Sequence, residues 1–278
     1  MSGTLYVVAT PIGNLEDLTS RARQLLAEVD LVAAEDTRHT GRLLSTIGAK
    51  PALLALHDHN EEQACAKVMD ALRGGKDVAL VSDAGTPLIS DPGYRVVRTA
   101  HADDVRVVPI PGASAVAADN AGLATDRFCF EGFPPAKRAA RRKWLAALAN
   151  EQRTIVFYES VHRIADCLAD MADAFGADRE AFMGRELTKL HEQCVQASLG
   201  ELRNRVDSGA IPVKGEFVLA VAGAVDDDAS AVDVDRMLVL LAASLSAKEA
   251  ARIAAELTGQ KKNALYDRIL KLKGERES

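Results

Sequence analysis

Short apolar runs alternate with amphipathic stretches over the first 125 residues of the chain. The apolar runs are rich in Val, Leu and Ala, as buried parallel strands are, and they cover residues 5–9, 31–34, 51–56, 77–81 and 105–110. The stretches between them predict helices at residues 18–28 and 61–72. They also predict a helix that follows residues 35–40 and ends near Gly48, one after Pro92 and one after Ser114. This alternation indicates a mostly parallel open sheet with helices on both faces.

The pattern changes after a Gly-Phe-Pro-Pro break at residues 132–135. Helices of unequal length then separate strands that are predicted at residues 154–158, 181–184 and 217–221, which fits a second α/β domain. Three aspartates at residues 226–228 indicate a polar linker. Beyond it, apolar spacing predicts a small helix–turn–helix from helices at residues 246–257 and 263–273. The expected domains are residues 1–125, 126–225 and 233–278.

Composition excludes several classes of protein. The chain has 278 residues, of which 48% are hydrophobic and 27% charged, so wholesale disorder is excluded. The four cysteines form no CxxC pair, which argues against a zinc site and fits a reducing compartment. The apolar run at residues 237–245 is about half the length of a membrane span, and the N-terminus lacks a signal-peptide pattern. A cytoplasmic protein is expected.

The net charge of −6 argues against a protein that coats nucleic acid with its whole surface. Two local basic segments stand against this acidic average, at residues 137–143 and 261–276. They suggest a directed contact with a polyanion. A solvated helix face remains the alternative for the first segment, and docking to a dimer partner remains the alternative for the second.

The segment from Ser82 to Gly93 is the most organised loop in the sequence. Gly85 would let backbone amides approach a ligand closely, prolines stiffen the loop, and Asp83 and Asp91 add hydrogen-bond acceptors. An ordinary strand-to-helix turn is the alternative. The GxGxxG and P-loop fingerprints are absent, so dinucleotide-binding and NTPase functions are not indicated.

Charged residues gather where other predicted strands end. Glu35, Asp36, Arg38 and His39 could orient a hydroxyl, clamp a phosphate or perform acid–base chemistry, or else Asp36 could simply cap a helix. Similar clusters occur at residues 158–163, 185–192 and 214–217. Because charges are expensive to bury, these clusters either line a cleft or form paired networks.

Seven segments of the sequence occur in the order found in one enzyme family. They include Ala-Thr-Pro-Ile-Gly-Asn-Leu-Glu-Asp, Ala-Glu-Asp-Thr-Arg-His-Thr and Arg-Glu-Leu-Thr-Lys, and they cover residues 9–17, 34–40, 82–93, 111–114, 157–163, 185–189 and 214–216. Over residues 4–223 the chain resembles the bacterial 16S ribosomal RNA (cytidine-2′-O)-methyltransferases of the tetrapyrrole-methylase-like superfamily. Its C-terminal piece resembles the helix–turn–helix extension of that family.

The resemblance implies two α/β domains of the tetrapyrrole methylase type, the class III methyltransferases, with S-adenosylmethionine in the cleft between them. It also implies a homodimer and, as substrate, a cytidine ribose in the decoding centre, so that a 30S particle is recognised. The sequence itself shows no recognition-helix pattern and no membrane span, so no DNA or membrane partner is expected. The residues that the resemblance places at the cofactor are Pro11, Asp83, Ala84, Gly85, Thr86, Pro87, Ser114, Ala115, Tyr158 and Leu187.

Methyl transfer to a ribose hydroxyl needs an in-line approach, no metal ion, and a group that takes the hydroxyl proton. The candidates for that group are Glu35, Asp36, Lys189 and Glu216. The residues expected to contact RNA are Arg38, His39, Lys137, Arg138, Arg141, Arg142, Lys143, Lys261 and Lys262. The alternatives are a tetrapyrrole or precorrin methyltransferase and a non-catalytic, cofactor-binding ribosome-assembly factor.

Overall fold

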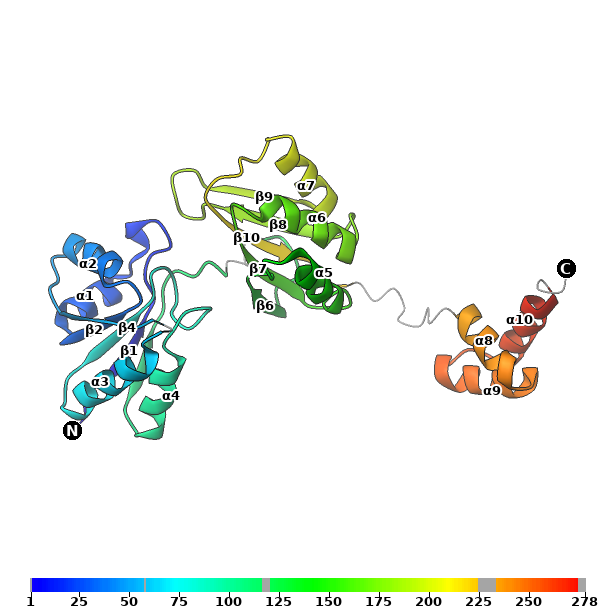
Figure 1. Ribbon diagram of the computed structural model, residues 1–278, viewed down its shortest axis with the longest axis horizontal. Helices are drawn as coiled ribbons and strands as arrows, with labels where there is room; N and C mark the ends of the chain where they lie inside the picture. Colours follow the sequence, from blue (N-terminus) through cyan, green and yellow to red (C-terminus); the bar gives the residue numbers. More distant parts are fainter. Residues whose placement is uncertain (1, 58, 117–120, 225–233, 275–278) are drawn as a thin grey trace. The chain divides into compact units, whose positions relative to one another are not determined.

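The structure is a computed structural model that describes residues 2–57, 59–116, 121–224 and 234–274. The chain divides into two compact units, Met1–Gly223 and Ala224–Ser278. Among the described residues, the first unit contains two five-stranded sheets and the second contains three helices (Figure 1).

The first sheet is parallel throughout and has the strand order β3-β2-β4-β1-β5. Its strands are β1 (Leu5–Val8), β2 (Leu31–Ala34), β3 (Ala52–Ala55), β4 (Val78–Val81) and β5 (Val107–Ile110). Each lies within, or coincides with, a predicted apolar run. The open parallel sheet is therefore confirmed.

Helices cover both faces of this sheet because alternate strand residues point to opposite sides. One face packs against α1 (Ser20–Glu28) and α2 (Thr37–Thr46) through Val8 and Val81. The other face packs against α3 (Glu61–Arg73) and α4 (Tyr94–Ala102) through Leu5 and Leu80. A short 3-10 helix, η1 (Leu15–Asp17), precedes α1, whose N-cap Thr19 accepts a hydrogen bond from the Ala22 amide at 3.1 Å.

The second sheet is mixed and has the order β6-β7-β10-β8-β9. Its strands are β6 (Phe128–Gly132), β7 (Thr154–Ser160), β8 (Glu180–Arg185), β9 (Gln193–Ser198) and β10 (Glu216–Val221). Only the β6–β7 pair among these is parallel. The three predicted strands are confirmed, whereas β6 and β9 were not predicted.

Helices pack on one face of the second sheet. Phe157 and Leu219 bury that face against α5 (Arg138–Ala147), α6 (Ile164–Phe175) and α7 (Leu199–Asp207). The opposite face, through Val156 and Val218, clusters with Ile12, which lies in the loop after β1. The second sheet therefore turns an apolar face toward loops of the first half of the unit.

The C-terminal unit consists of α8 (Val234–Ser244), α9 (Ala247–Thr258) and α10 (Lys262–Gly274) around a small apolar core. Ser246 and Glu249 form a capping box at the start of α9, and Gly259 ends it with a φ of +68°. The two predicted helices of the helix–turn–helix are confirmed. Across the residues that the structure describes, no helix is long and apolar enough to cross a membrane.

Two sequence expectations fall wholly or partly outside the described residues. The helix expected after Ser114 is not found in residues 114–116 or 121–127, and residues 117–120 lie outside the described part of the chain. The aspartates of the expected linker, at residues 226–228, also lie outside it.

Candidate active site

A cavity of about 390 Å³ lies where the loops after several strands meet the apolar face of the second sheet. The first half of the unit contributes Ile12 and the loops after β4 and β5. The second half contributes the end of β7, the start of β10 and single residues that follow β6 and β8. Its size falls in the range of small-molecule sites, roughly 300–1,000 Å³. Ligands of open α/β sheets bind at this end of the strands.

Seven of the ten predicted cofactor residues line this cavity: Ala84, Gly85, Thr86, Ser114, Ala115, Tyr158 and Leu187. Pro11 and Asp83 instead line a neighbouring cavity, and Pro87 lies buried within the loop. The sequence analysis did not single out Ile12 and Phe133, which also line the cavity. Asp91, which it named as a hydrogen-bond acceptor of the organised loop, lies in the cavity wall as well.

The loop after β4 is held in an unusual backbone conformation. Gly85 has a φ of +84°, and Leu88 and Ser90 also have positive φ values, which residues with side chains adopt at a cost. Gly85 pairs with Thr10 through two backbone hydrogen bonds of 2.9 and 3.1 Å. A Cβ at Gly85 would lie 3.2 Å from Ile12 Cγ2. The cavity wall therefore depends on a residue without a side chain.

Tyr158 forms part of the apolar wall. Its ring makes edge contacts with Phe130 and Phe133 at centroid distances of 4.7 and 5.5 Å. Burial, aided by the charge of Asp91, raises the pKa of Tyr158 to about 12. The phenol is therefore neutral at physiological pH and can donate a hydrogen bond to a ligand.

Asp91 is a cavity carboxyl with altered acidity. Burial raises the pKa of Asp91 to about 6, the charge of Glu35 adds to the rise, and a hydrogen bond with Ser82 opposes it. Glu35, a predicted catalytic candidate, thus acts electrostatically on a residue of the cavity wall. At neutral pH Asp91 is mostly ionised, and it is a stronger base than an ordinary aspartate.

The raised pKa of Asp91 predicts a pH-dependent effect of Asp91→Asn. The native carboxyl keeps its proton to a higher pH than the unfolded chain does, so wild-type stability falls as the pH rises from about 4 through about 6. We expect the free energy of unfolding of Asp91→Asn, relative to that of the wild type, to be about 1 kcal/mol higher at pH 8 than at pH 5. This value takes into account that the group is partly exposed. Urea unfolding at the two pH values measures this, with the exposed Asp178→Asn as control. An equal effect of Asp91→Asn at both values would contradict it.

Lys189 is fixed between two carboxylates beside the cavity. Its Nζ lies 3.1 Å from Glu186 Oε1 and 2.9 Å from Glu216 Oε2. Burial opposes the charge of Lys189, but the hydrogen bonds with Glu216 and Glu186 raise its pKa above the usual value. Lys189 is therefore a cation, which does not fit the neutral amine that proton removal requires. A Cβ at Gly13 would lie 2.3 Å from Lys189 Cγ, so the lysine stem crosses the loop after β1 closely.

Asp36 takes the structural role that the sequence left open. As N-cap of α2 it accepts hydrogen bonds from the amides of Arg38 and His39 at 2.8 and 3.4 Å. The Arg38 side chain is paired with Asp36 at 3.3 Å, and hydrogen bonds from Arg38 lower the pKa of Asp36. Neither Asp36 nor Arg38 lines the two cavities. Capping thus accounts for Asp36 without a catalytic role.

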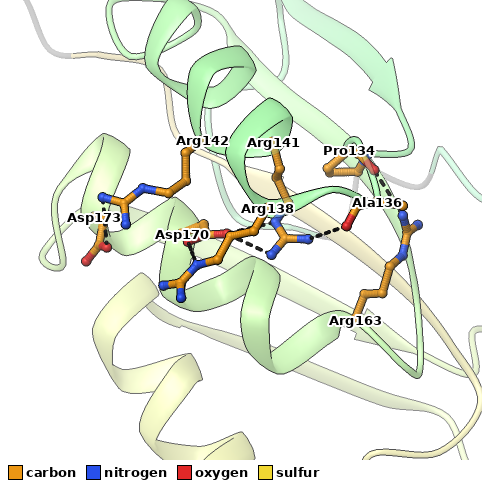
Figure 2. Close-up of polar contacts among 8 residues, drawn as sticks. All are labelled: Pro134, Ala136, Arg138, Arg141, Arg142, Arg163, Asp170 and Asp173. Atoms are coloured by element: carbon orange, nitrogen blue, oxygen red, sulfur yellow. Dashed lines mark hydrogen bonds and ion pairs between the residues drawn. The ribbon is translucent and has the colours of Figure 1, made fainter.

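The three arginines of the basic segment at residues 137–143 are paired with carboxylates of the protein (Figure 2). Arg141 is only 2% exposed and pairs at 2.7 Å with Asp170, which is fully buried on α6. Arg138 also binds Asp170, at 3.1 Å, and Arg142 lies 3.6 Å from Asp173. The predicted RNA contact is therefore corrected for Arg141, because a buried, paired guanidinium cannot reach a phosphate.

Other predicted RNA-contacting cations are exposed. Lys137 and Lys143 flank the paired arginines on α5, and Lys261 and Lys262 lie at the start of α10 in the C-terminal unit. His39 is exposed on α2 and lines the neighbouring cavity. For these five residues the RNA contact stays a prediction.

Comparisons with known proteins agree with this geometry. The family model described as Tetrapyrrole (Corrin/Porphyrin) Methylases matches residues 4–203, and the model described as RsmI C-terminal HTH domain matches residues 228–273. A Pseudomonas aeruginosa protein named Ribosomal RNA small subunit methyltransferase I is 50% identical over 98% of this chain and 99% of its own. A protein of the same name from Escherichia coli O157:H7 is 51% identical over 98% of this chain and 96% of its own.

Solved structures show the same fold at lower identity. A cobalt precorrin-4 methyltransferase of cobalamin biosynthesis is 21% identical, with a TM-score of 0.55 over 78% of this chain and 94% of its own. A uroporphyrin-III C-methyltransferase from Thermus thermophilus, solved with S-adenosyl homocysteine, is 20% identical, with a TM-score of 0.53 over 79% of this chain and 97% of its own.

Proposed function

We propose that this chain, which belongs to the tetrapyrrole (corrin/porphyrin) methylase family, transfers a methyl group from S-adenosylmethionine to RNA of the small ribosomal subunit. The name shared by relatives that are about half identical over nearly the whole chain supports this substrate. The observation that carries the proposal is the convergence of distant sequence segments on one cavity. Ile12, Gly85, Ser114, Tyr158 and Leu187 all line it.

The cavity fits the cofactor. Tyr158, Leu187 and Ile12 would cover its apolar parts, and Ser114 and Ala115 would hold its polar end. Gly85 leaves the space that a Cβ would fill. S-adenosylmethionine supplies a methyl group that is already activated on a sulfonium, so the protein mainly has to position the acceptor.

The acceptor in this proposal is the 2′-hydroxyl of a cytidine ribose, which has to give up its proton. Asp91, Glu159 and Glu216 line the cavity as carboxylates, but Glu159 is paired with Arg163 and Glu216 with Lys189. We assign proton removal to Asp91, whose pKa of about 6 makes it a stronger base than an ordinary aspartate. Glu35 supports that basicity by its charge. Lys189 and Glu216 form the fixed ion pair beside the reacting groups.

The cellular setting belongs to the same proposal. The family resemblance supports action on an assembled 30S particle in the cytoplasm, by a homodimer. Lys137, Lys143, Lys261 and Lys262 are exposed cations that could contact RNA phosphates outside the cavity.

We expect labelled methyl to pass from S-adenosylmethionine to 30S particles isolated from a strain that lacks this protein. Nuclease digestion and mass spectrometry would then locate the label on one cytidine ribose of 16S RNA. A precorrin and free 16S RNA serve as competing substrates. Measurable cofactor binding without transfer to the particle would overturn the proposed function, and transfer to the precorrin would favour a small-molecule enzyme.

A further inference from the structure

A second cavity, of about 370 Å³, adjoins the cofactor cavity. Ile12, Ala84 and Glu216 line both cavities, so the two share a wall. The second cavity opens between the loop after β1 and one side of α2. A group held there would lie next to whatever the first cavity contains.

The second cavity has an apolar wall, a basic wall on α2, and two carboxylates, Asp83 and Glu216, of which Glu216 is paired with Lys189. Leu15, which is 50% exposed, and Leu43 provide apolar surface. His39 and Arg42 both line it, and they are three residues apart on α2, a spacing that places them on one side of the helix. The apolar side chains can contact a ring, and the basic side chains can bind a negative charge. A nucleotide has both a ring and a negative charge.

Arg42 is the cation in this wall that is free to bind an anion. It is exposed, and within the described part of the chain its side chain has no ion-pair partner. The other cations nearby differ, since Arg38 is paired with Asp36 and Lys189 with Glu186 and Glu216. A guanidinium can bind a phosphate through two parallel hydrogen bonds.

We propose that the second cavity receives the nucleotide of the RNA strand that is to be methylated, and that Arg42 binds a phosphate of that strand. Leu15 and Leu43 then contact the base or sugar. This inference rests on the proposed function, because it needs a methyl acceptor that is part of an RNA chain. It assigns to Arg42 a substrate-binding role that the sequence pattern did not indicate.

The test compares Arg42→Glu with Arg98→Glu. Arg98 is an exposed residue of α4 that lines neither cavity. Arg98→Glu therefore changes the net charge by the same amount at a site away from both cavities. The dissociation constant for 30S particles from a strain lacking the protein is measured over a range of salt concentrations. We expect Arg42→Glu to weaken binding at least tenfold, and the slope of log affinity against log salt to become shallower by about 0.7–0.9. Arg42→Lys should retain part of the affinity because it keeps the charge.

Two results of the binding measurements would overturn the inference. One is equal binding by the Arg42→Glu and Arg98→Glu proteins. The other is weaker binding of S-adenosyl homocysteine by Arg42→Glu in calorimetry, which would place Arg42 in the cofactor site. Particle binding that depends on Arg42 without any methyl transfer would uphold the cavity assignment and overturn the proposed reaction. Normal methyl transfer by the Arg42→Glu protein would overturn the cavity assignment and uphold the proposed reaction.

Discussion

Asp170→Ala is expected to lower the free energy of unfolding of the full chain by about 3–5 kcal/mol. The Asp170 carboxylate is fully buried and pairs with Arg141, which is 2% exposed, so the substitution leaves a buried guanidinium without a counter-charge. Urea unfolding measures the loss. Thermal unfolding should show a fall of roughly 10 °C, at about 2–4 °C per kcal/mol for a unit of this size.

Matched variants separate this effect from ordinary surface electrostatics. Asp173→Ala breaks the exposed pair between Arg142 and Asp173 and should cost less than about 1 kcal/mol. The double variant Arg141→Met with Asp170→Leu should regain much of the stability lost by Asp170→Ala, because no charge then stays buried. If Asp170→Ala lowered the free energy of unfolding by less than about 1 kcal/mol, the ion pair between Arg141 and Asp170 would not be a main stabilising contact between α5 and α6.

Gly85→Val is expected to abolish measurable cofactor binding, with a dissociation constant raised more than about a hundredfold. Gly85 has a φ of +84°, which a β-branched residue adopts only under strain, and its Cβ would press on Ile12 Cγ2 at 3.2 Å. Gly85→Ala should lower the free energy of unfolding by about 1–2 kcal/mol because of the left-handed backbone, and the Cβ that it adds 3.2 Å from Ile12 Cγ2 in the cavity wall should lower the affinity for the cofactor roughly tenfold. Calorimetry with S-adenosyl homocysteine checks both values.

Gly48→Ala is the control for strain alone. Gly48 has a φ of +72° with nothing within 4 Å of an added Cβ, and it lines neither cavity. This variant should lose stability to a similar extent while keeping the wild-type affinity for S-adenosyl homocysteine. If Gly48→Ala weakened binding of S-adenosyl homocysteine as much as Gly85→Ala does, the loss of affinity would come from a general loss of stability and not from a change in the cavity wall.

Local pattern predicted the first sheet well because parallel strands that are buried on both faces read as continuous apolar runs. It missed β9, Gln193–Ser198, because this strand lies at the edge of a sheet, has no buried residue and is half polar. It also missed β6, Phe128–Gly132, which is short and whose pairing with β7 shifts register before Gly132. Edge position and register arise from partners that are distant in sequence.

Local pattern in the sequence was enough to predict the first sheet, three strands of the second, the helical C-terminal piece and the glycine-containing loop that lines the first cavity, since periodicity and turn residues act over a few neighbours. Which charged side chains can bind a ligand depended on contacts between elements that are distant in sequence. Arg141 looked like an RNA contact until Asp170, from another helix, was found to neutralise it in the interior. Lys189 became a fixed cation through Glu216. Arg42, which the sequence did not single out, proved to line a cavity. A charge is committed or free according to its partners in space, and spacing along the chain does not encode them.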